Sequence, residues 1–333
     1  MLRATLIGLT LVFAVGTAAA QARPAAKPTA KAVAKPTPTK AKQKPAARRA
    51  VARAPARPSE AKRAGLSRTG DPLNLRSSVA LVVNQDTEEV LFQKNPDAVL
   101  PIASITKLMT ALVTVEAGLP LDEELEVTRE DRTVDRVRSN LRPGLNLTRG
   151  QALHLALMSS ENHAAHLLGR TYPGGMEAFV DAMNAKAQML GMHDSRFVEP
   201  TGLSADNRSS PGDLVRLVKA AYELETIREF STSTAMELPV GKRTVRYGNT
   251  NRLTASDDWD IGVSKTGTTM AAGHCLVMQA AIEGQRIVMV LLDSVGKYSR
   301  IADAQRIRNW LETHKLVGER KPAAPASKPI DLM

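Results

Sequence analysis

The sequence predicts an α/β (α+β) fold, in which one antiparallel sheet is built from both ends of the domain and a helical subdomain is inserted between them. The prediction rests on a repeated order of elements. Two β-rich runs followed by a helical pattern occur near residues 79–115 and again near residues 276–314. Residues 148–223, between the two copies, show mainly helical periodicity. Strands joined by short turns pair antiparallel, so we expect one sheet with a helical lobe beside it.

The first copy starts with β-rich runs at 79–84 and 89–93, which flank four polar residues and predict a hairpin. After Pro101 the apolar period changes from two to that of a helix, which begins at Ser104. Ser104 is therefore expected at a helix N-terminus, where free backbone N–H groups favour developing negative charge.

The middle of the chain is less uniform. Residues 121–147 are polar and show no clear pattern. Thr148 and Gln151 then form a capping-box pattern, which predicts the start of a helix. Two further helices are predicted, at 176–189 and 211–223.

The second copy comprises β-rich runs at 276–282 and 287–292 and a helix near 298–314. Residues 71–315 are therefore predicted to form the folded domain. Cys275 is the chain's single cysteine, so no internal disulfide can form, and its apolar surroundings predict a buried structural thiol.

The first twenty residues have the pattern of a secretory signal peptide. Arg3 precedes an apolar run at 4–16, and small residues up to Ala20 form a cleavage site. The pattern predicts export to a periplasm, with cleavage near Ala20 and no transmembrane anchor afterwards. An uncleaved N-terminal anchor is the alternative.

Residues 21–70 are predicted to be a disordered, basic Pro/Ala/Lys linker. They contain 14 Lys or Arg and one acidic residue, whereas residues 71–333 carry a net charge of −3. The basic charge therefore belongs to the arm and predicts no nucleic-acid partner for the domain. The arm is expected either to contact anionic envelope polymers loosely or to act as a solvated spacer. Residues 316–333 are predicted to be a disordered tail without an apolar anchor.

The predicted helix at Ser104 carries a candidate nucleophile and its base. Ser104 and Lys107 are one helical turn apart and share a face, so the amine can reach the hydroxyl. The same spacing recurs at Ser59 and Lys62, in the predicted linker, so the spacing alone is a weak signal.

Two further motifs follow in order, Ser160-Glu161-Asn162 and Lys265-Thr266-Gly267. Lys107 can act as a base only if its pKa is lowered, by desolvation or by a positive charge such as Lys265. Ser160 is then a candidate to relay a proton to a leaving amine, and Asn162 to orient Lys107 or the substrate.

Strand residues are the candidates for substrate binding. Backbone N–H groups of Ser104 and Thr268 are expected to bind a tetrahedral oxyanion. Lys265 and the hydroxyls of Thr266 and Thr268 are expected to hold a substrate carboxylate. An edge strand that starts at Ser264, and so includes Gly267, can also pair with an extended peptide.

The ordered motifs resemble those of the low-molecular-mass penicillin-binding proteins of the D-Ala-D-Ala carboxypeptidase and endopeptidase family. The similarity covers about residues 75–314, and Glu161 in the second motif resembles the endopeptidase branch. Further matching segments are 77–111, 197–203, 209–214, 249–251 and 272–277.

The resemblance implies a β-lactamase/transpeptidase-like fold and a serine DD-peptidase that forms an acyl-enzyme on Ser104. It also implies peptidoglycan stem peptides as substrates, β-lactams as covalent inhibitors, and no cofactor. We expect no metal site, because the zinc-protease glutamate is absent between His163 and His166.

Two other functions remain open from the sequence. Glu199 follows the second motif roughly where some β-lactamases keep the glutamate that activates deacylating water, so a β-lactamase is one alternative. A catalytically idle penicillin-binding wall module is the other. The preference between endopeptidase and carboxypeptidase also stays open, because both reactions use the same acyl-enzyme.

Overall fold

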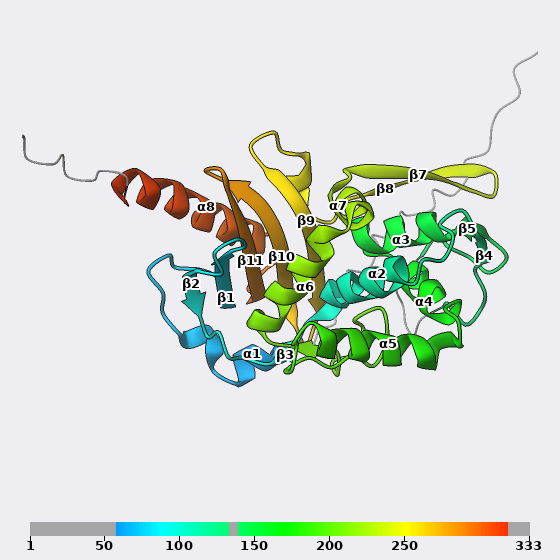
Figure 1. The fold of residues 1–333 in the computed structure, drawn as a ribbon, viewed down its shortest axis with the longest axis horizontal. Coiled ribbons are helices and arrows are strands. Elements are labelled where there is room, and N and C mark those ends of the chain that lie inside the picture. Colours follow the sequence, from blue (N-terminus) through cyan, green and yellow to red (C-terminus); the bar gives the residue numbers. More distant parts are fainter. Residues whose placement is uncertain (1–57, 133–138, 319–333) are drawn as a thin grey trace, which may run out of the picture. The chain divides into compact units, whose positions relative to one another are not determined.

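A computed structural model describes residues 58–132 and 139–318, and its main element is a five-stranded sheet (Figure 1). The strand order is β2-β1-β11-β10-β9, and all neighbouring pairs are antiparallel. Strands from the first part of the chain thus pair with strands from the last part, which confirms the predicted fold. The strands are β1 (Ser77–Asn84), β2 (Val90–Lys94), β9 (Asp260–Thr269), β10 (Gly273–Ile282) and β11 (Gln285–Ser294).

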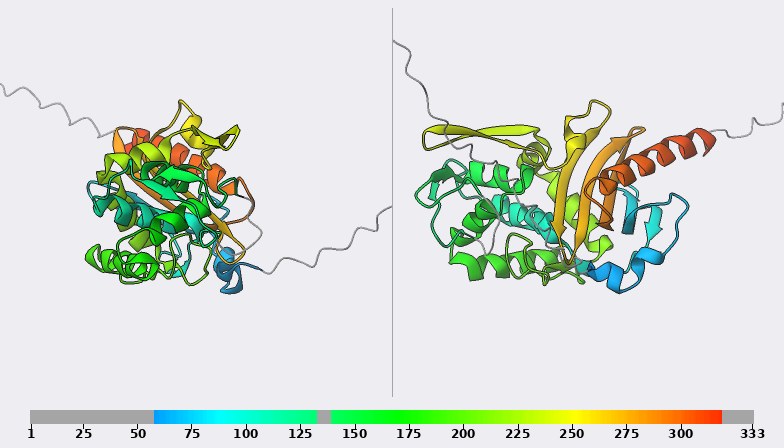
Figure 2. Two further views of the ribbon diagram at one scale, coloured as in Figure 1. Left: turned by 90° about the vertical axis from the view of Figure 1, so that its right-hand side faces the viewer. Right: turned by 180° about the vertical axis from the view of Figure 1, so that it is seen from behind.

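Both faces of the sheet are covered by helices (Figures 1 and 2). Alternate side chains of β1 enter two different cores: Leu81 faces the helical region, whereas Val82 faces α8 (Ser299–Gly318). Ala304 and Ile307 of α8 complete the second core. This two-sided burial explains why β1 is apolar along a continuous run instead of alternating with polar residues.

The helical region contains the predicted helices, and their start signals act as expected. The Thr148 side chain accepts a hydrogen bond from the Gln151 backbone, which completes the capping box. Ser210 caps the next predicted helix by accepting from the Asp213 backbone. The helices are α2 (Thr106–Glu116), α3 (Arg149–Met158), α4 (Asn162–Arg170), α5 (Gly175–Met189), α6 (Pro211–Glu223) and α7 (Glu225–Thr232).

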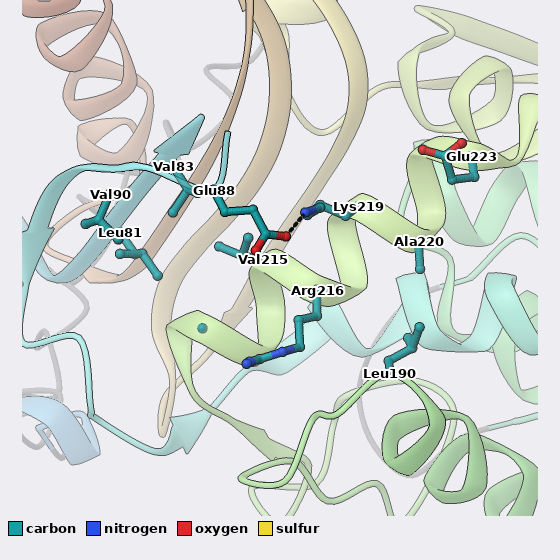
Figure 3. Close-up of a pocket in the computed structure, with 11 residues that line it drawn as sticks. Leu81, Val83, Glu88, Val90, Leu190, Val215, Arg216, Lys219, Ala220 and Glu223 are labelled. Carbon is teal, nitrogen blue, oxygen red and sulfur yellow. Dashed lines mark hydrogen bonds and ion pairs between the residues drawn. The ribbon is translucent and has the colours of Figure 1, made fainter. Parts of the chain in front are cut away.

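Helix α6 packs beside the first hairpin, as Figure 3 shows. Apolar side chains such as Leu81 and Val215 line a groove of 520 Å³ between the two elements. The groove is bridged by an ion pair of 2.5 Å between Lys219 of α6 and Glu88 of the hairpin turn. This contact joins the helical region to the sheet on the face opposite α8.

Among the described residues, three short two-stranded pairings lie outside the main sheet, and the sequence patterns did not indicate them. Their strands are only two to six residues long, so their partners specify them more than their own sequence does. The pairs are β3 (Leu100–Pro101) with β6 (Arg208–Ser209), β4 (Glu124–Glu126) with β5 (Asn146–Thr148), and β7 (Ala235–Val240) with β8 (Arg243–Gly248).

The predicted linker boundary at residue 70 is wrong, because residues 58–70 contain α1 (Glu60–Arg63) and the 3₁₀ turn η1 (Leu66–Arg68). The Ala61 side chain is only 1% exposed. The Glu60 carboxylate accepts hydrogen bonds of 3.0 and 2.5 Å from the Arg208 guanidinium, and the Glu60 N–H donates to the Ala271 carbonyl. These partners are more than a hundred residues away, so local composition gave no sign of them.

The predicted signal peptide, most of the linker and most of the tail lie outside the described residues. Within ranges 58–132 and 139–318, no helix combines the length and the hydrophobicity that a membrane crossing requires. Helix α8 continues to Gly318, slightly past the predicted domain end.

Candidate active site

Ser104 lies in a short turn between a strand and a helix. The 3₁₀ turn η2 (Ala103–Ile105) leads directly into α2, so the predicted position of Ser104 at a helix start is confirmed. Ala103 has a φ of 48°, in the left-handed region that non-glycine residues rarely occupy. The Thr106 hydroxyl donates a hydrogen bond of 2.9 Å to the Ala103 carbonyl. The turn therefore fixes the position of Ser104 through a strained conformation that its surroundings hold in place.

Two glycines let neighbouring segments approach the backbone of this turn closely. A Cβ atom on Gly202 would lie 2.0 Å from the Ala103 carbonyl oxygen, and Gly202 has a φ of 82°. A Cβ atom on Gly267 would lie 3.0 Å from the Ser104 nitrogen. A larger residue at either position would displace the backbone. The loop that contains Gly202 and strand β9 therefore enclose the turn from two sides.

Lys107 is completely buried one helical turn after Ser104. Its Nζ lies 2.9 Å from the Ser104 hydroxyl oxygen. It also lies 2.7 Å from Asn162 Oδ1 and 2.6 Å from the Thr201 carbonyl oxygen. These last two oxygens can only accept hydrogen bonds, so they take two N–H groups of the amine. When the amine is neutral, its lone pair is left for the Ser104 hydroxyl, which is the geometry of a nucleophile and its base.

Burial lowers the pKa of Lys107 from 10.5 to about 7. The negative charges of Glu199 and Glu161 act in the opposite direction. Desolvation is thus the main cause, rather than a neighbouring positive charge. The pKa of Lys265 is also well below its usual value, because of burial and because Lys107 and Arg300 repel its charge.

The turn between α3 and α4 brings the second motif to the amine. Asn162 begins α4 and is 8% exposed. Glu161 caps this helix by accepting from the His163 backbone at 3.2 Å. Ser160, two residues before Asn162, has a φ of 61°, so this turn is also strained. The structure therefore joins the first and second motifs through the contact between Lys107 and Asn162.

The third motif lies inside strand β9, which begins at Asp260, before the predicted strand start at Ser264. β9 is an edge of the five-stranded sheet, as predicted, so it has a free side for an extended peptide. The Lys265 amine donates to the Thr266 carbonyl at 3.0 Å, and the Thr266 hydroxyl donates to Thr250 Oγ1 at 2.7 Å. Gly267 contacts the turn of Ser104, and the Thr268 hydroxyl donates to the Gly267 carbonyl.

Arg300 belongs to the same site, although the sequence motifs did not indicate it. Its Nη1 lies 2.9 Å from the Gly267 carbonyl oxygen and 3.0 Å from the Thr268 hydroxyl oxygen. It comes from α8, 33 residues after Gly267 and outside any short motif. Thr201 was missed for another reason: its backbone carbonyl binds Lys107, and any residue type can supply a carbonyl.

The site collects positive charge. Lys107, Lys265 and Arg300 are all largely buried, and burial lowers the pKa of each. A desolvated cationic site beside an open strand edge is suited to a peptide that carries a carboxylate.

The D-alanyl-D-alanine carboxypeptidase family matches residues 67–296. The chain belongs to this family. A D-alanyl-D-alanine endopeptidase of Pseudomonas aeruginosa is 48% identical over 253 residues, which are 74% of this chain and 81% of that protein. A D-alanyl-D-alanine endopeptidase of Escherichia coli is 43% identical over 263 residues, 78% of this chain and 85% of that protein. The crystal structure of a Streptomyces DD-transpeptidase has a TM-score of 0.68 at 26% identity, covering 74% of this chain and all of that one.

In this member of the D-alanyl-D-alanine carboxypeptidase family, Glu199 anchors a loop. Both of its carboxylate oxygens accept hydrogen bonds, and the loop they hold presents the Thr201 carbonyl to Lys107. A carboxylate that activates water needs an oxygen free to accept a proton, whereas both oxygens of Glu199 already accept hydrogen bonds from its own loop. The donors are the backbone N–H groups of Thr201, Gly202 and Ser204, the Thr201 hydroxyl and the Asn207 amide.

The histidine and cysteine side chains considered as metal ligands or reactive groups have structural roles. His163 Nδ1 lies 3.2 Å from the Leu141 carbonyl oxygen, and His166 Nδ1 lies 3.0 Å from Asp131. No group of His, Cys, Asp or Glu side chains within the described ranges has the arrangement of a metal site. Cys275 is fully buried, and burial raises its pKa to about 12, which keeps the thiol protonated.

Proposed function

We propose that this chain is a serine DD-peptidase that hydrolyses D-Ala-containing peptide bonds of peptidoglycan through an acyl-enzyme on Ser104. The observation that carries the proposal is the buried Lys107 amine, 2.9 Å from the Ser104 hydroxyl, with its pKa lowered to about 7. Family membership and the named endopeptidase relatives support the substrate class.

Acylation starts with proton transfer from Ser104 to Lys107. The neutral amine takes the hydroxyl proton while Oγ attacks the carbonyl carbon of the scissile peptide bond. The carbonyl oxygen becomes a tetrahedral oxyanion, and the backbone N–H groups of Ser104 and Thr268 are its donors. Collapse of this intermediate breaks the C–N bond and leaves an ester on Ser104.

The departing amine needs a proton, and the substrate needs a fixed orientation. Ser160 relays the proton from Lys107 to the leaving nitrogen, while Asn162 keeps the amine in place. Lys265 and the hydroxyls of Thr266 and Thr268 bind the substrate carboxylate, and Arg300 adds a further cation to this site. Water then attacks the ester, with Lys107 again accepting a proton.

β-Lactams form the corresponding ester with Ser104, and we expect this ester to hydrolyse slowly. Glu199 is bonded through both oxygens to its own loop, which argues against a deacylation base of the β-lactamase kind. Turnover of a chromogenic cephalosporin at many molecules per second by the purified protein would contradict the peptidase assignment.

Mass spectrometry of the penicillin-treated protein tests the acyl-enzyme directly. The wild type should gain one penicilloyl group on Ser104, and Ser104→Ala should lose both labelling and cleavage of purified cross-linked muropeptides. Ser59→Ala is the matched control, because it changes the serine of another Ser-x-x-Lys pair that also lies at a helix start. Unchanged muropeptide cleavage by Ser104→Ala would reject the serine mechanism. Wild-type protein that binds penicillin but does not cleave muropeptides would favour an idle wall module.

The proposal favours endopeptidase activity on cross-links, with carboxypeptidase activity as a second reaction of the same acyl-enzyme. Its support is that the relatives at 48%, 43% and 36% identity are all named D-alanyl-D-alanine endopeptidases. Product analysis by mass spectrometry separates the two, because one splits a muropeptide dimer and the other releases a terminal D-Ala.

We place the mature protein in the periplasm, after cleavage near Ala20, on the basis of its signal-peptide pattern. The basic arm is proposed to contact anionic envelope polymers. Deletion of residues 21–57 should reduce retention on isolated cell walls while cleavage of soluble muropeptides continues. Loss of activity on soluble substrate would give the arm a role in catalysis.

A further inference from the structure

His274 lies beside the proposed carboxylate site but outside the three motifs. It is the second residue of strand β10 and pairs directly with Thr268 of β9. Its ring Nδ1 lies 3.0 Å from the Thr268 hydroxyl oxygen. Residues directly opposite each other in an antiparallel pair place their side chains on the same face of the sheet. His274 is therefore next to a hydroxyl that is proposed to bind the substrate.

The Thr268 hydroxyl has two further polar neighbours besides this imidazole. Arg300 Nη1 lies 3.0 Å away and can only donate, so it takes one lone pair of the hydroxyl oxygen. The Gly267 carbonyl oxygen lies 2.7 Å away and can only accept. The hydroxyl then has one proton and one lone pair left to place. The protonation of His274 Nδ1 decides how these two are used.

Two arrangements of protons fit these distances. If His274 Nδ1 carries a proton, it donates to Thr268, and the hydroxyl can only donate in turn, to the Gly267 carbonyl or to a bound carboxylate. If Nδ1 carries no proton, it competes as an acceptor and turns the hydroxyl proton away from the carboxylate. An imidazolium has a proton on both ring nitrogens, so it permits only the first arrangement.

The backbone around His274 is specialised for this position. Gly273 has a φ of 67°, and a Cβ atom there would lie 2.1 Å from Asp293 Oδ1, so glycine lets the Asp293 carboxylate approach the start of β10. The pairing of β10 with β11 shifts register between His274 and Leu276. Such bulges turn side chains toward new directions and are frequent next to active sites.

Two charged groups act on the His274 ring, Arg300 of α8 and Asp293 of β11. Burial lowers the pKa of His274 from 6.5, and repulsion from Arg300 acts in the same direction, whereas Asp293 opposes both. The adjacent Cys275 thiol stays neutral, because burial raises its pKa to about 12. The imidazolium therefore forms below pH 6.5, and a bound carboxylate favours it.

We propose that His274 is a positioning residue, which sets the direction of the Thr268 hydroxyl and strengthens carboxylate binding when the imidazole is protonated. It acts through Thr268 rather than by contact with the substrate. The inference rests on the proposed DD-peptidase function and adds to it a dependence of carboxylate recognition on pH.

Penicillin and its methyl ester test this role in the full-length protein, because the ester lacks the carboxylate. The measured quantity is the ratio of the two second-order acylation rate constants, acid to ester, from about pH 5 to about pH 8. Titration of Lys107 affects both compounds alike and cancels in this ratio. The wild-type ratio should fall about three- to tenfold as the pH rises through the pKa of His274, the range expected of one hydrogen bond.

Two variants should remove this pH dependence. In His274→Asn an amide can occupy the position of Nδ1 but has no proton that titrates in this range. Thr268→Val keeps the shape of the side chain but removes the hydroxyl through which His274 acts. His193→Asn is the matched control, because His193 is exposed in the turn after α5, and its ratio should depend on pH as in the wild type.

A wild-type ratio that stays constant over this pH range would overturn the proposal without any variant having to fold. Persistence of the pH dependence in His274→Asn would also overturn it, by assigning the titration to another group. Persistence in Thr268→Val would contradict action through the hydroxyl and place His274 on the substrate itself. Failure of the proposed function is distinguishable from these results, because the wild type would then gain no penicilloyl group from either compound at any pH.

Discussion

The chain contains the Ser-x-x-Lys spacing twice at a helix start, and the two copies differ in burial and partners. In α1, the Ser59 hydroxyl accepts the backbone N–H of Lys62 at 3.3 Å, and the Lys62 side chain is exposed. In the active site, the Lys107 amine is fully buried and contacts the Ser104 hydroxyl itself. One serine is thus a helix cap, and the other is paired with a base.

The comparison separates what spacing provides from what the fold provides. Spacing sets an amine within reach of a hydroxyl in both helices. The fold adds two features at Lys107. Asn162 and Thr201 accept hydrogen bonds from two N–H groups of the Lys107 amine, and burial lowers the pKa of this amine to about 7. A serine–lysine pair therefore gains its chemistry from residues that lie far away in the sequence.

Replacing the lysine of each Ser-x-x-Lys pair in turn should give the largest difference in acylation rate. Lys107→Met keeps an unbranched side chain in the buried site but removes the base, so we expect the acylation rate by penicillin to fall by about 10²- to 10⁴-fold. Lys62→Met should acylate at the wild-type rate. Stopped-flow acylation measures both, and circular dichroism checks that each variant is folded. A Lys107→Met rate within tenfold of wild type would assign the base to another group.

Two glycines with positive φ allow a matched test of the walls around the nucleophile. A Cβ on Gly202 would lie 2.0 Å from the Ala103 carbonyl oxygen, whereas one on Gly65, beside α1, meets no atom within 4 Å. Gly202→Ala should cost about 3 kcal/mol or more of unfolding free energy and slow acylation sharply, because the Ser104 turn must move. Gly65→Ala should cost only about 1 kcal/mol from its backbone conformation.

Urea titration and penicillin acylation of both variants decide this prediction. Equal stability losses in Gly202→Ala and Gly65→Ala would show that backbone conformation, and not the close approach to Ala103, is the reason for glycine at position 202.

The structure brings the three predicted motifs together, and the elements that carry them had clear signals in the sequence. The capping box at Thr148 and the β-rich run before Ser104 are local patterns, so the elements they mark were placed correctly. Glu60 and Arg300 were missed because their partners lie 148 and 33 residues away. Composition around Glu60 indicates a linker, whereas its contacts with Arg208 and Ala271 fix it in the fold.

The charge on Glu199 should adjust the pH at which Lys107 becomes a base. The acylation rate of the wild type should rise with pH around an inflection near 7, because the neutral amine is the active form. Glu199 raises the pKa of Lys107, so Glu199→Gln should move the inflection to lower pH. The limiting acylation rate of Glu199→Gln at high pH should also be lower than that of the wild type, because the glutamine amide cannot accept all of the hydrogen bonds that the loop donates to the Glu199 carboxylate.

Asn207→Ala separates the charge of Glu199 from its anchoring of the loop. This variant removes a donor to Glu199 but leaves the carboxylate, so the rate should fall while the inflection keeps its wild-type position. An inflection that stays near 7 in Glu199→Gln would show that the charge of this residue has no influence on the base.

The smallest expected effect concerns the attachment of α1, which distinguishes a docked helix from a linker. The bond to Arg208 lowers the pKa of Glu60 below 4.5 in the folded protein, so the ionised carboxylate stabilises the fold. This contribution is fully present above pH 4.5 and is lost as the pH falls through the lowered folded-state pKa. Glu60→Gln should therefore reduce the unfolding free energy by about 1 kcal/mol or less at pH 7, with a difference from wild type that shrinks in acid.

Urea unfolding at several pH values between 7 and 3 measures this difference. Glu177→Gln is the matched control, because Glu177 is also an acidic residue in the first turn of a helix and is exposed. It should change the unfolding free energy less than Glu60→Gln at pH 7. Equal effects of the two substitutions would mean that the ion pair contributes no net stability. The packing of Ala61 and the hydrogen bond to Ala271 would then be the interactions that hold α1 against the turn between β9 and β10.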